Sequence, residues 1–89
     1  MAKYPSSGEI NRQVPDTGAA ISAISDAYSA DAIAVDDTDG ISIEFADWRF
    51  NLRGSNTEPV IRLNVESRGN ESLMREKTGE ILAKLEAMS

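Results

Sequence analysis

Between residues 41 and 66, apolar and polar side chains alternate in three successive runs, and this pattern restricts the fold more than any other feature. Apolar residues take every second position: Ile41, Ile43 and Phe45, then Trp48, Phe50 and Leu52, then Ile61, Leu63 and Val65. A period of two places alternate side chains on opposite faces of a strand. Short connections join consecutive antiparallel strands. The sequence therefore predicts three such strands with one buried face.

A short strand and a helix are expected ahead of these runs. Glu9–Val14 has the pattern of a strand with Ile10 and Val14 on one face, and its polarity and the following proline suit a sheet edge. Asp16 and Thr17 are both suitable N-cap residues, and they predict a helix over about residues 17–29. The apolar residues with helical spacing are Ala20, Ile21, Ile24, Ala27 and Tyr28.

An acidic stretch follows the next apolar run, Ala32–Val35, which has the length of a strand. The three carboxylates of Asp36-Asp37-Thr38-Asp39-Gly40 suggest a metal site, but their spacing does not match a calcium loop. Asp39-Gly40 between two apolar runs is a typical hairpin signal. The sequence therefore predicts a turn here and no metal site.

The chain is expected to end in a helix that begins at Asn70 or Glu71. One stripe of it holds Met74, Thr78, Ile81, Leu82, Leu85 and Met88. The predicted order is β-α-β-β-β-β-α. This order gives an α+β fold in which two helices pack on one face of a mostly antiparallel sheet.

The length of 89 residues and the composition predict one globular domain over residues 9–89, preceded by a linker over residues 1–8. Fifteen acidic against nine basic residues give a net charge of -6, which argues against binding to nucleic acid or to an anionic membrane. Because the sequence lacks cysteine and histidine, disulfides, the usual zinc sites and the commonest general base are excluded. No apolar run has the length of a membrane span, so a cytoplasmic location is expected.

The loop Arg53–Pro59 concentrates hydrogen-bond donors between two predicted strands. The Arg53 guanidinium can pair two N–H groups with two phosphate oxygens, and Ser55, Asn56 and Thr57 add side-chain donors. Backbone N–H groups facing the same way would add more, and Gly54 permits a positive φ or a close approach to a ligand. The same residue types also form ordinary turns. The residue types alone are therefore compatible with two interpretations of this loop, an ordinary polar turn and a phosphate-binding loop.

Two further arginines, Arg49 and Arg62, are expected on the polar faces of the adjoining strands. They are accessory candidates for an anion site because they would extend its positive field. Alternatively, they would form ion pairs across the sheet. The acidic partners within reach are Glu44, Asp47 and Glu66.

The run from Thr38 to Arg53, continued by Gly54-Ser55-Asn56-Thr57-Glu58-Pro59 and residues 60–69, strongly resembles the C-terminal domain of bacterial phosphomannomutases in the α-D-phosphohexomutase superfamily. The resemblance implies a TATA-box-binding-protein-like fold. It also implies a four-domain, Mg²⁺-dependent parent enzyme that interconverts mannose 6-phosphate and mannose 1-phosphate. The phosphoserine, magnesium and sugar-recognition loops of that family belong to the other three domains. The chain alone is therefore expected to be inactive, with no catalytic residue or metal of its own.

The same resemblance implies that Arg53, Ser55, Asn56 and Thr57 are ligands of the hexose phosphate group that is not transferred. Gly54 departs from the residue types often found there, and Asn56 favours a mannomutase over a phosphoglucosamine mutase. Two other interpretations are a phosphoglucomutase-type domain and a non-catalytic protein-interaction module. A nucleic-acid-binding domain that uses sheet aromatics is disfavoured because the net charge is -6 and Trp48 is expected on the apolar face.

Overall fold

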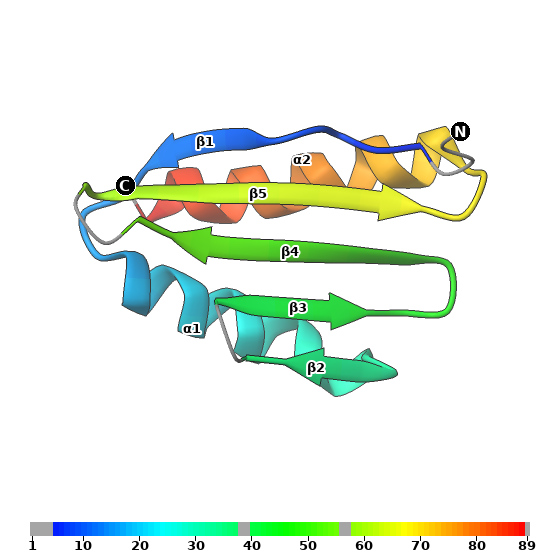
Figure 1. Cartoon of the computed structure of the whole chain (residues 1–89), viewed down its shortest axis with the longest axis horizontal. Helices are drawn as coiled ribbons and strands as arrows, with labels where there is room; N and C mark the ends of the chain where they lie inside the picture. Colours follow the sequence, from blue (N-terminus) through cyan, green and yellow to red (C-terminus); the bar gives the residue numbers. More distant parts are fainter. Residues whose placement is uncertain (1–4, 38–39, 56–57, 89) are drawn as a thin grey trace.

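A computed structural model describes residues 5–37, 40–55 and 58–88. Its elements are β1 (Ile10–Gln13), α1 (Thr17–Tyr28), the 3-10 turn η1 (Ser29–Asp31), β2 (Ala34–Asp36), β3 (Ile41–Glu44), β4 (Trp48–Gly54), β5 (Val60–Ser67) and α2 (Glu71–Ala87). The strands form one antiparallel sheet in the order β1-β5-β4-β3-β2 (Figure 1). The predicted α+β class and order of elements are confirmed. The likeness to the TATA-box-binding-protein fold stays a prediction.

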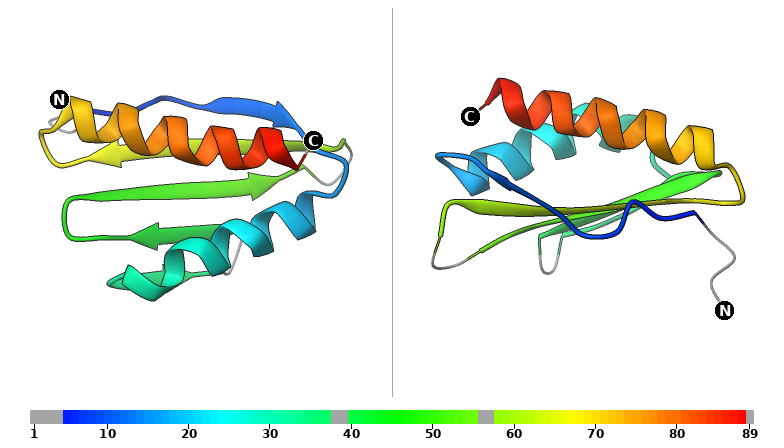
Figure 2. Two further views of the ribbon diagram at one scale, coloured as in Figure 1. Left: turned by 180° about the vertical axis from the view of Figure 1, so that it is seen from behind. Right: turned by 90° about the horizontal axis from the view of Figure 1, so that it is seen from above.

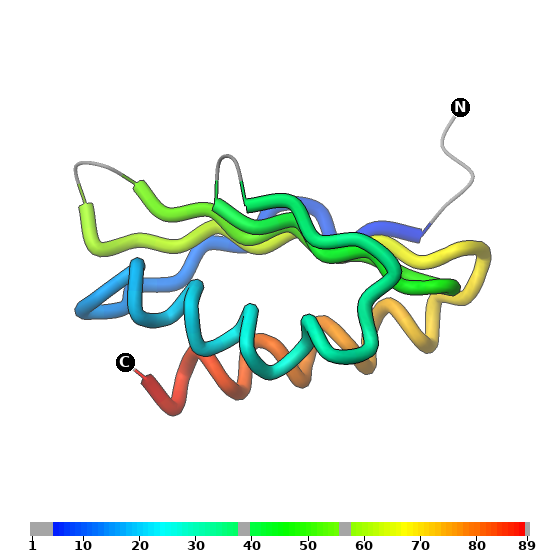
Figure 3. The backbone as a smooth tube through the Cα atoms, turned by 90° about the horizontal axis from the view of Figure 1, so that it is seen from below, coloured from blue at the N-terminus to red at the C-terminus, as the bar shows by residue number. Residues whose placement is uncertain are grey.

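Both helices lie on one face of the sheet and leave the other face open (Figures 2 and 3). The alternation of β3, β4 and β5 places their apolar side chains under the helices, as the period of two predicts. The buried apolar residues are Val14, Ala20, Ile24, Ile41, Ile43, Phe45, Trp48, Phe50, Leu52, Ile61, Leu63, Val65, Met74, Ile81 and Leu85. The placement of Trp48 and Phe50 on the apolar face is confirmed.

Side chains cap the start of each helix. The Asp16 carboxylate accepts a hydrogen bond from the N–H of Ala19, and the Asn70 side-chain oxygen accepts one from the N–H of Leu73, both at 3.0 Å. The expected apolar stripe of α1 is wrong at one position, because Ala27 is exposed. Ala27 lies outside the buried face of α1 that contains Ile24, and its small methyl side chain can be exposed to solvent at little cost.

The two edge strands differ in how well the sequence predicts them. β1 lies at the edge as expected, with Ile10 partly buried and Val14 buried. β2 begins at Ala34 and not at Ala32, because η1 prolongs the helical segment to Asp31. Val35 of β2 and Ile33 just ahead of it are not core residues, since they are 48% and 67% exposed. The predicted hairpin residue Asp39 lies outside the described residues, whereas Gly40 has the positive φ of 80° that suits a turn.

An aromatic cluster with a polar rim joins the helices to the sheet. Tyr28 of α1 meets Phe45, Trp48 and Phe50 edge to face, with ring centroids 5.4–6.3 Å apart. Its hydroxyl donates to Oε1 of Glu80 on α2 at 3.0 Å. Burial and this hydrogen bond raise the pKa of Tyr28.

Glu80 shows the opposite shift. Burial alone would raise its pKa, but hydrogen bonds from Tyr28 and Lys77, with the nearby charges of Lys77 and Lys84, lower it. The contact thus links α1 to α2 through an ionised carboxylate.

The N-terminal segment Pro5–Ser7 runs beside the C-terminal end of β5, away from the β4–β5 loop. The N–H of Ser7 donates to the carbonyl of Val65 at 2.8 Å, and the N–H of Ser67 donates to the carbonyl of Pro5 at 3.0 Å. Residues 1–4 of the predicted linker lie outside the described residues, and the domain boundary at residue 8 stays a prediction. Within the described ranges, neither helix has the length and apolarity needed to cross a bilayer.

Candidate functional site

The open face of the sheet carries the polar side chains of the alternating strands. These exposed or half-buried residues are Ser42, Glu44, Arg49, Asn51, Arg53, Arg62, Asn64 and Glu66. The register of β4 and β5 sets them opposite each other as Arg49 and Glu66, then Asn51 and Asn64, then Arg53 and Arg62. A depression of about 540 Å³ lies on this face, with both asparagines in its lining.

Arg53 stands at the end of β4 nearest the β4–β5 loop (Figure 1). Gly40, just ahead of β3, lies beside it: a Cβ there would be 3.0 Å from Cα and 3.1 Å from Cγ of Arg53, and would overlap the carbonyl of Leu52. On its other side, Arg53 lies directly opposite Arg62 on β5. The missing side chain of Gly40 therefore leaves room for the Arg53 stem, which the sequence did not reveal.

Gly54 is the last residue of β4, and its expected role in a positive-φ turn is wrong. The glycines with positive φ among the described residues are Gly8, Gly40 and Gly69. At Gly54 the close approach is instead to the start of α1, because a Cβ would lie 3.0 Å from Cβ of Thr17. Gly54 thus lets the end of β4 pack against α1, and its role beside a bound phosphate stays a prediction.

Ser55 follows the strand and closes the loop. Its backbone N–H donates to the carbonyl of Val60 at 2.9 Å. The expectation that loop N–H groups face a ligand therefore fails at this residue, which would bind an anion through its hydroxyl. Asn56 and Thr57, the other two predicted ligands, lie outside the described residues.

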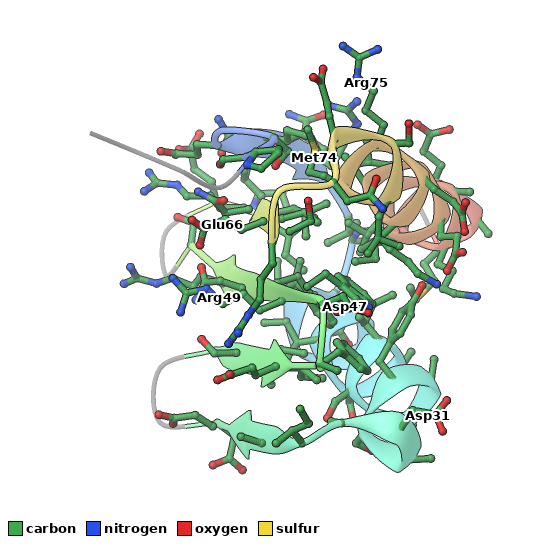
Figure 4. The ribbon with its side chains drawn as sticks, turned by 90° about the vertical axis from the view of Figure 1, so that its right-hand side faces the viewer. Asp31, Asp47, Arg49, Glu66, Met74 and Arg75 are labelled. Atoms are coloured by element: carbon green, nitrogen blue, oxygen red, sulfur yellow. The ribbon has the colours of Figure 1, made fainter. Side chains whose placement is uncertain are left out.

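The two accessory candidates both form ion pairs. Nε and Nη2 of Arg49 each lie 2.9 Å from Oε1 of Glu66, and Figure 4 shows this pair on the side of the sheet away from the helices. Nε of Arg62 lies 3.3 Å from Oε2 of Glu9. The sequence predicts Glu66 as a partner of these arginines, whereas Glu9 is not among the acidic residues expected within reach. Glu9 immediately precedes β1, and the pairing of β1 with β5 brings it close to Arg62.

The loop end of the β4–β5 pair brings hydrogen-bond donors together. The sequence has no histidine or cysteine, and the described ranges contain no group of three acidic side chains that could hold a metal ion. The resemblance assigns the magnesium ion to another domain of the parent enzyme, and the described residues of this chain do not form a site that fits it. The site provides the exposed guanidinium groups of Arg53 and Arg62 and the hydroxyl of Ser55, at the loop end of the paired strands β4 and β5.

The chain matches the family described as "Phosphoglucomutase/phosphomannomutase, C-terminal domain" over residues 9–83. Because the match covers most of the sequence, the chain belongs to this family. Residues 38–69, which carry the sequence resemblance, lie within the matched range.

Several curated relatives are phosphomannomutases. The chain is 58% identical over 82 residues to "Phosphomannomutase" of Salmonella montevideo, covering 92% of this chain and 18% of the relative. It is 56% identical over 85 residues to that of Escherichia coli strain K12, covering 96% and 19%. The corresponding protein of Methanocaldococcus jannaschii is 44% identical over 90 residues, covering 98% and 19%. The chain thus spans less than a fifth of the length of these relatives.

Proposed function

We propose that the chain is the phosphate-binding domain of a phosphomannomutase that interconverts mannose 6-phosphate and mannose 1-phosphate. The observation that carries this proposal is the position of Arg53, the penultimate residue of the central strand β4, beside a donor-rich loop. Relatives with 58% and 56% identity are phosphomannomutases. The proposal includes a cytoplasmic location and a magnesium ion bound by another domain of the parent enzyme.

Arg53, Ser55, Asn56 and Thr57 would hold the phosphate that is not transferred, while Gly54 keeps the end of β4 against α1. Phosphoryl transfer depends largely on positioning and charge stabilisation. A loop that contacts only phosphate binds a sugar phosphate by either end. This freedom suits a reaction in which the sugar must turn over between two half-reactions.

Closure of this domain over the active site is part of the proposal. Closure would bring the loop to the other three domains and exclude water from the transfer step. The loop projects from β4 and β5, the most extensively paired strands of the sheet. A rigid mount of this kind holds donors at fixed positions and reduces the entropy lost on binding.

The first test is titration of mannose 1-phosphate into the ¹⁵N-labelled 89-residue chain, followed by amide chemical shifts. We expect shifts centred on residues 53–57 and a dissociation constant on the order of millimolar, or about −4 kcal/mol. Arg53→Ala should remove the shifts. Arg75→Ala, which removes the same charge from α2, is the matched control. Shifts centred elsewhere would refute the proposed site.

The second test uses the full-length parent enzyme. Arg53→Ala should raise KM for the sugar phosphate about tenfold or more, because a charge-assisted hydrogen bond is worth about 1.5–3 kcal/mol. Unchanged kinetics would contradict the phosphate-binding role. Equal turnover of glucose 1-phosphate and mannose 1-phosphate would instead favour a phosphoglucomutase-type enzyme, which the family description also includes.

A further inference from the structure

An uncharged row of polar side chains crosses the open face of the sheet, one step in from the loop end. Ser42 of β3 is the register partner of Asn51 on β4, and Asn51 is the register partner of Asn64 on β5. Two residues further along β4 in either direction, the same face carries a charged side chain, Arg53 toward the loop and Arg49 away from it. The uncharged row, Ser42, Asn51 and Asn64, therefore interrupts a charged surface with amide and hydroxyl groups.

Hydrogen bonds within the protein hold the two amide groups of this row. Nδ2 of Asn51 donates to Oγ of Ser42 at 3.0 Å, and Oγ of Ser6 donates to Oδ1 of Asn64 at 3.3 Å. A primary amide has two N–H donors and one carbonyl acceptor. The carbonyl oxygen of Asn51 and the NH2 group of Asn64 thus retain capacity for a ligand. An acceptor beside a donor matches a hydroxyl group, which both donates and accepts.

The depression on the open face places this row where a small molecule can lie. Its volume is about 540 Å³, and all three residues of the uncharged row line it. Ligand sites commonly have volumes of about 300–1,000 Å³. Both asparagines are half-buried, so a ligand in the depression would meet side chains that have already lost part of their contact with water. Their hydrogen bonds also reduce the entropy that ordering would cost on binding.

The spacing along β4 relates this row to the proposed phosphate position. Asn51 precedes Arg53 by two residues, which corresponds to about 7 Å in an extended strand. In a hexose phosphate the ring follows the phosphorus after one ester oxygen in the 1-phosphate, and after that oxygen and one carbon in the 6-phosphate. A sugar phosphate whose phosphate contacts Arg53 can therefore extend its ring over the uncharged row.

We propose that Asn51 and Asn64 bind hydroxyl groups of the hexose ring while the loop after β4 holds the phosphate of the same molecule. This inference rests on the proposed function, because Arg53 and the loop set the position of the phosphate. A ring hydroxyl donates to the carbonyl oxygen of Asn51 and accepts from the NH2 group of Asn64. The domain thus contacts the sugar as well as its phosphate.

The charged residues beyond the uncharged row restrict what the row accepts. Arg49 lies between its register partners Glu44 and Glu66, and Nε and Nη2 of Arg49 each lie 2.9 Å from Oε1 of Glu66. Two carboxylates with one arginine repel a second phosphate group. A neutral ring is therefore accommodated here, whereas a second phosphate on the sugar would point away from this face.

The test compares methyl phosphate with mannose 1-phosphate, because both are phosphate monoesters and only one has a ring. Dissociation constants come from backbone amide shifts of the ¹⁵N-labelled 89-residue chain. Mannose 1-phosphate should bind about three- to tenfold more tightly, since each neutral hydrogen bond contributes modestly. The side-chain NH2 signals of Asn51 and Asn64 should shift with mannose 1-phosphate and stay unchanged with methyl phosphate. Equal affinities for the two ligands would overturn the proposal, as would unshifted NH2 signals.

Substitutions give a second readout. Asn51→Ala and Asn64→Ala should each reduce the preference for mannose 1-phosphate about two- to fivefold and leave the affinity for methyl phosphate unchanged. Asn11→Ala is the matched control, because it removes an exposed amide of β1 that is not among the lining residues of the depression. Loss of stability in urea with an unchanged preference would show a purely structural role and contradict the inference. The NH2 signals of the unmodified chain need no variant, so the test stands even if a variant unfolds.

The outcomes also distinguish this inference from the proposed function. Backbone shifts at residues 53–55 with methyl phosphate would support the phosphate site without involving the asparagines. The same shifts with equal affinities for the two ligands would refute only the sugar contact. Absence of shifts at residues 53–55 with either ligand would refute the phosphate site, and with it a ring position that depends on that site.

Discussion

The two ends of the β4–β5 pair carry contrasting charges on the same face of one sheet. At the end that leads to α2, Arg49 lies opposite Glu66 and the two form an ion pair. At the loop end, Arg53 lies opposite Arg62, and the negative partner of Arg62 comes from the neighbouring edge, at Glu9. Both ends belong to the same antiparallel pair of strands, but their charge patterns differ.

This difference contrasts an attractive cross-strand pair with a cross-strand pair of like charges. Opposite charges across strands contribute roughly 0.2–1 kcal/mol, whereas like charges cost a similar amount. Natural proteins break such local rules mainly at functional sites. The loop end breaks the rule beside a run of donors, and the other end obeys it.

The largest expected effect comes from Gly40, which shapes the loop end alone. Gly40→Ala should lower the free energy of unfolding by about 2–4 kcal/mol, because its φ is 80° and a Cβ would overlap the Leu52 carbonyl. Urea denaturation measures this loss. Gly69→Ala is a control with a similar φ of 71° but no atom within 4 Å of the added Cβ. Equal losses in the two variants would show that the space beside Arg53 is irrelevant.

Arg53→Glu would make the loop end resemble the paired end. The substitution places opposite charges across the strands at Arg62 but removes the interactions that Arg53 makes, so the free energy of unfolding should change by less than about 0.5 kcal/mol. Phosphate affinity should fall more than about tenfold, since the donor is replaced by a like charge. Amide-shift titration and urea denaturation check both, with Arg75→Glu as the charge-matched control. Retained phosphate binding would contradict the comparison.

The reverse change is Glu66→Arg, which would give the paired end a like-charge pair. Losing the contact with Arg49 and adding repulsion should lower the free energy of unfolding by about 1 kcal/mol. Phosphate should not bind at this end, because the carboxylate of Glu44 stays opposite Arg49 on the neighbouring strand. Phosphate-induced shifts at residues 49 and 66 that match those at the loop end would mean that two arginines suffice.

Tyr28→Phe should leave the charge pairs at both ends of β4 and β5 unchanged, and it is expected to have the smallest effect of these variants. Loss of the hydroxyl bond to Glu80 should cost about 0.5 kcal/mol at pH 7, since the carboxylate is partly exposed. The pKa of Glu80 is lowered in the folded state. Its contribution is therefore present above the ordinary glutamate pKa and is lost as pH falls through the lower folded value. Urea denaturation at pH 7 and pH 3 should show the difference shrinking in acid; a constant difference would contradict this assignment.

Much of the fold was predictable because periodicity reports which side chains are buried. The strands from residue 41 to 67 and both helices follow from it, with boundaries within about two residues. β2 was less predictable, because an apolar run such as Ala32–Val35 gives no sign of whether a helix covers it. Here Ile33 and Val35 lie at a sheet edge and stay exposed.

The candidate site was predictable in its residue types but not in its geometry. Arg53 and the donors after it are visible in the sequence, and the family resemblance gives them a role. The pairing of Arg53 with Arg62 depends on strand register, which the turn geometry of residues 54–60 determines. Glu9 reaches Arg62 only because β1 pairs with β5, although 53 residues separate the two in sequence.

The short edge strand β2 has a consequence for how the chain behaves at high concentration. It has three residues, all exposed, and pairs along one side only with β3. An open strand edge is a template for pairing with another molecule, and shortness and charge are the usual protection. Asp36 supplies a charge at the end of β2. The charge of Asp36 is therefore expected to oppose edge-to-edge association of two molecules through β2.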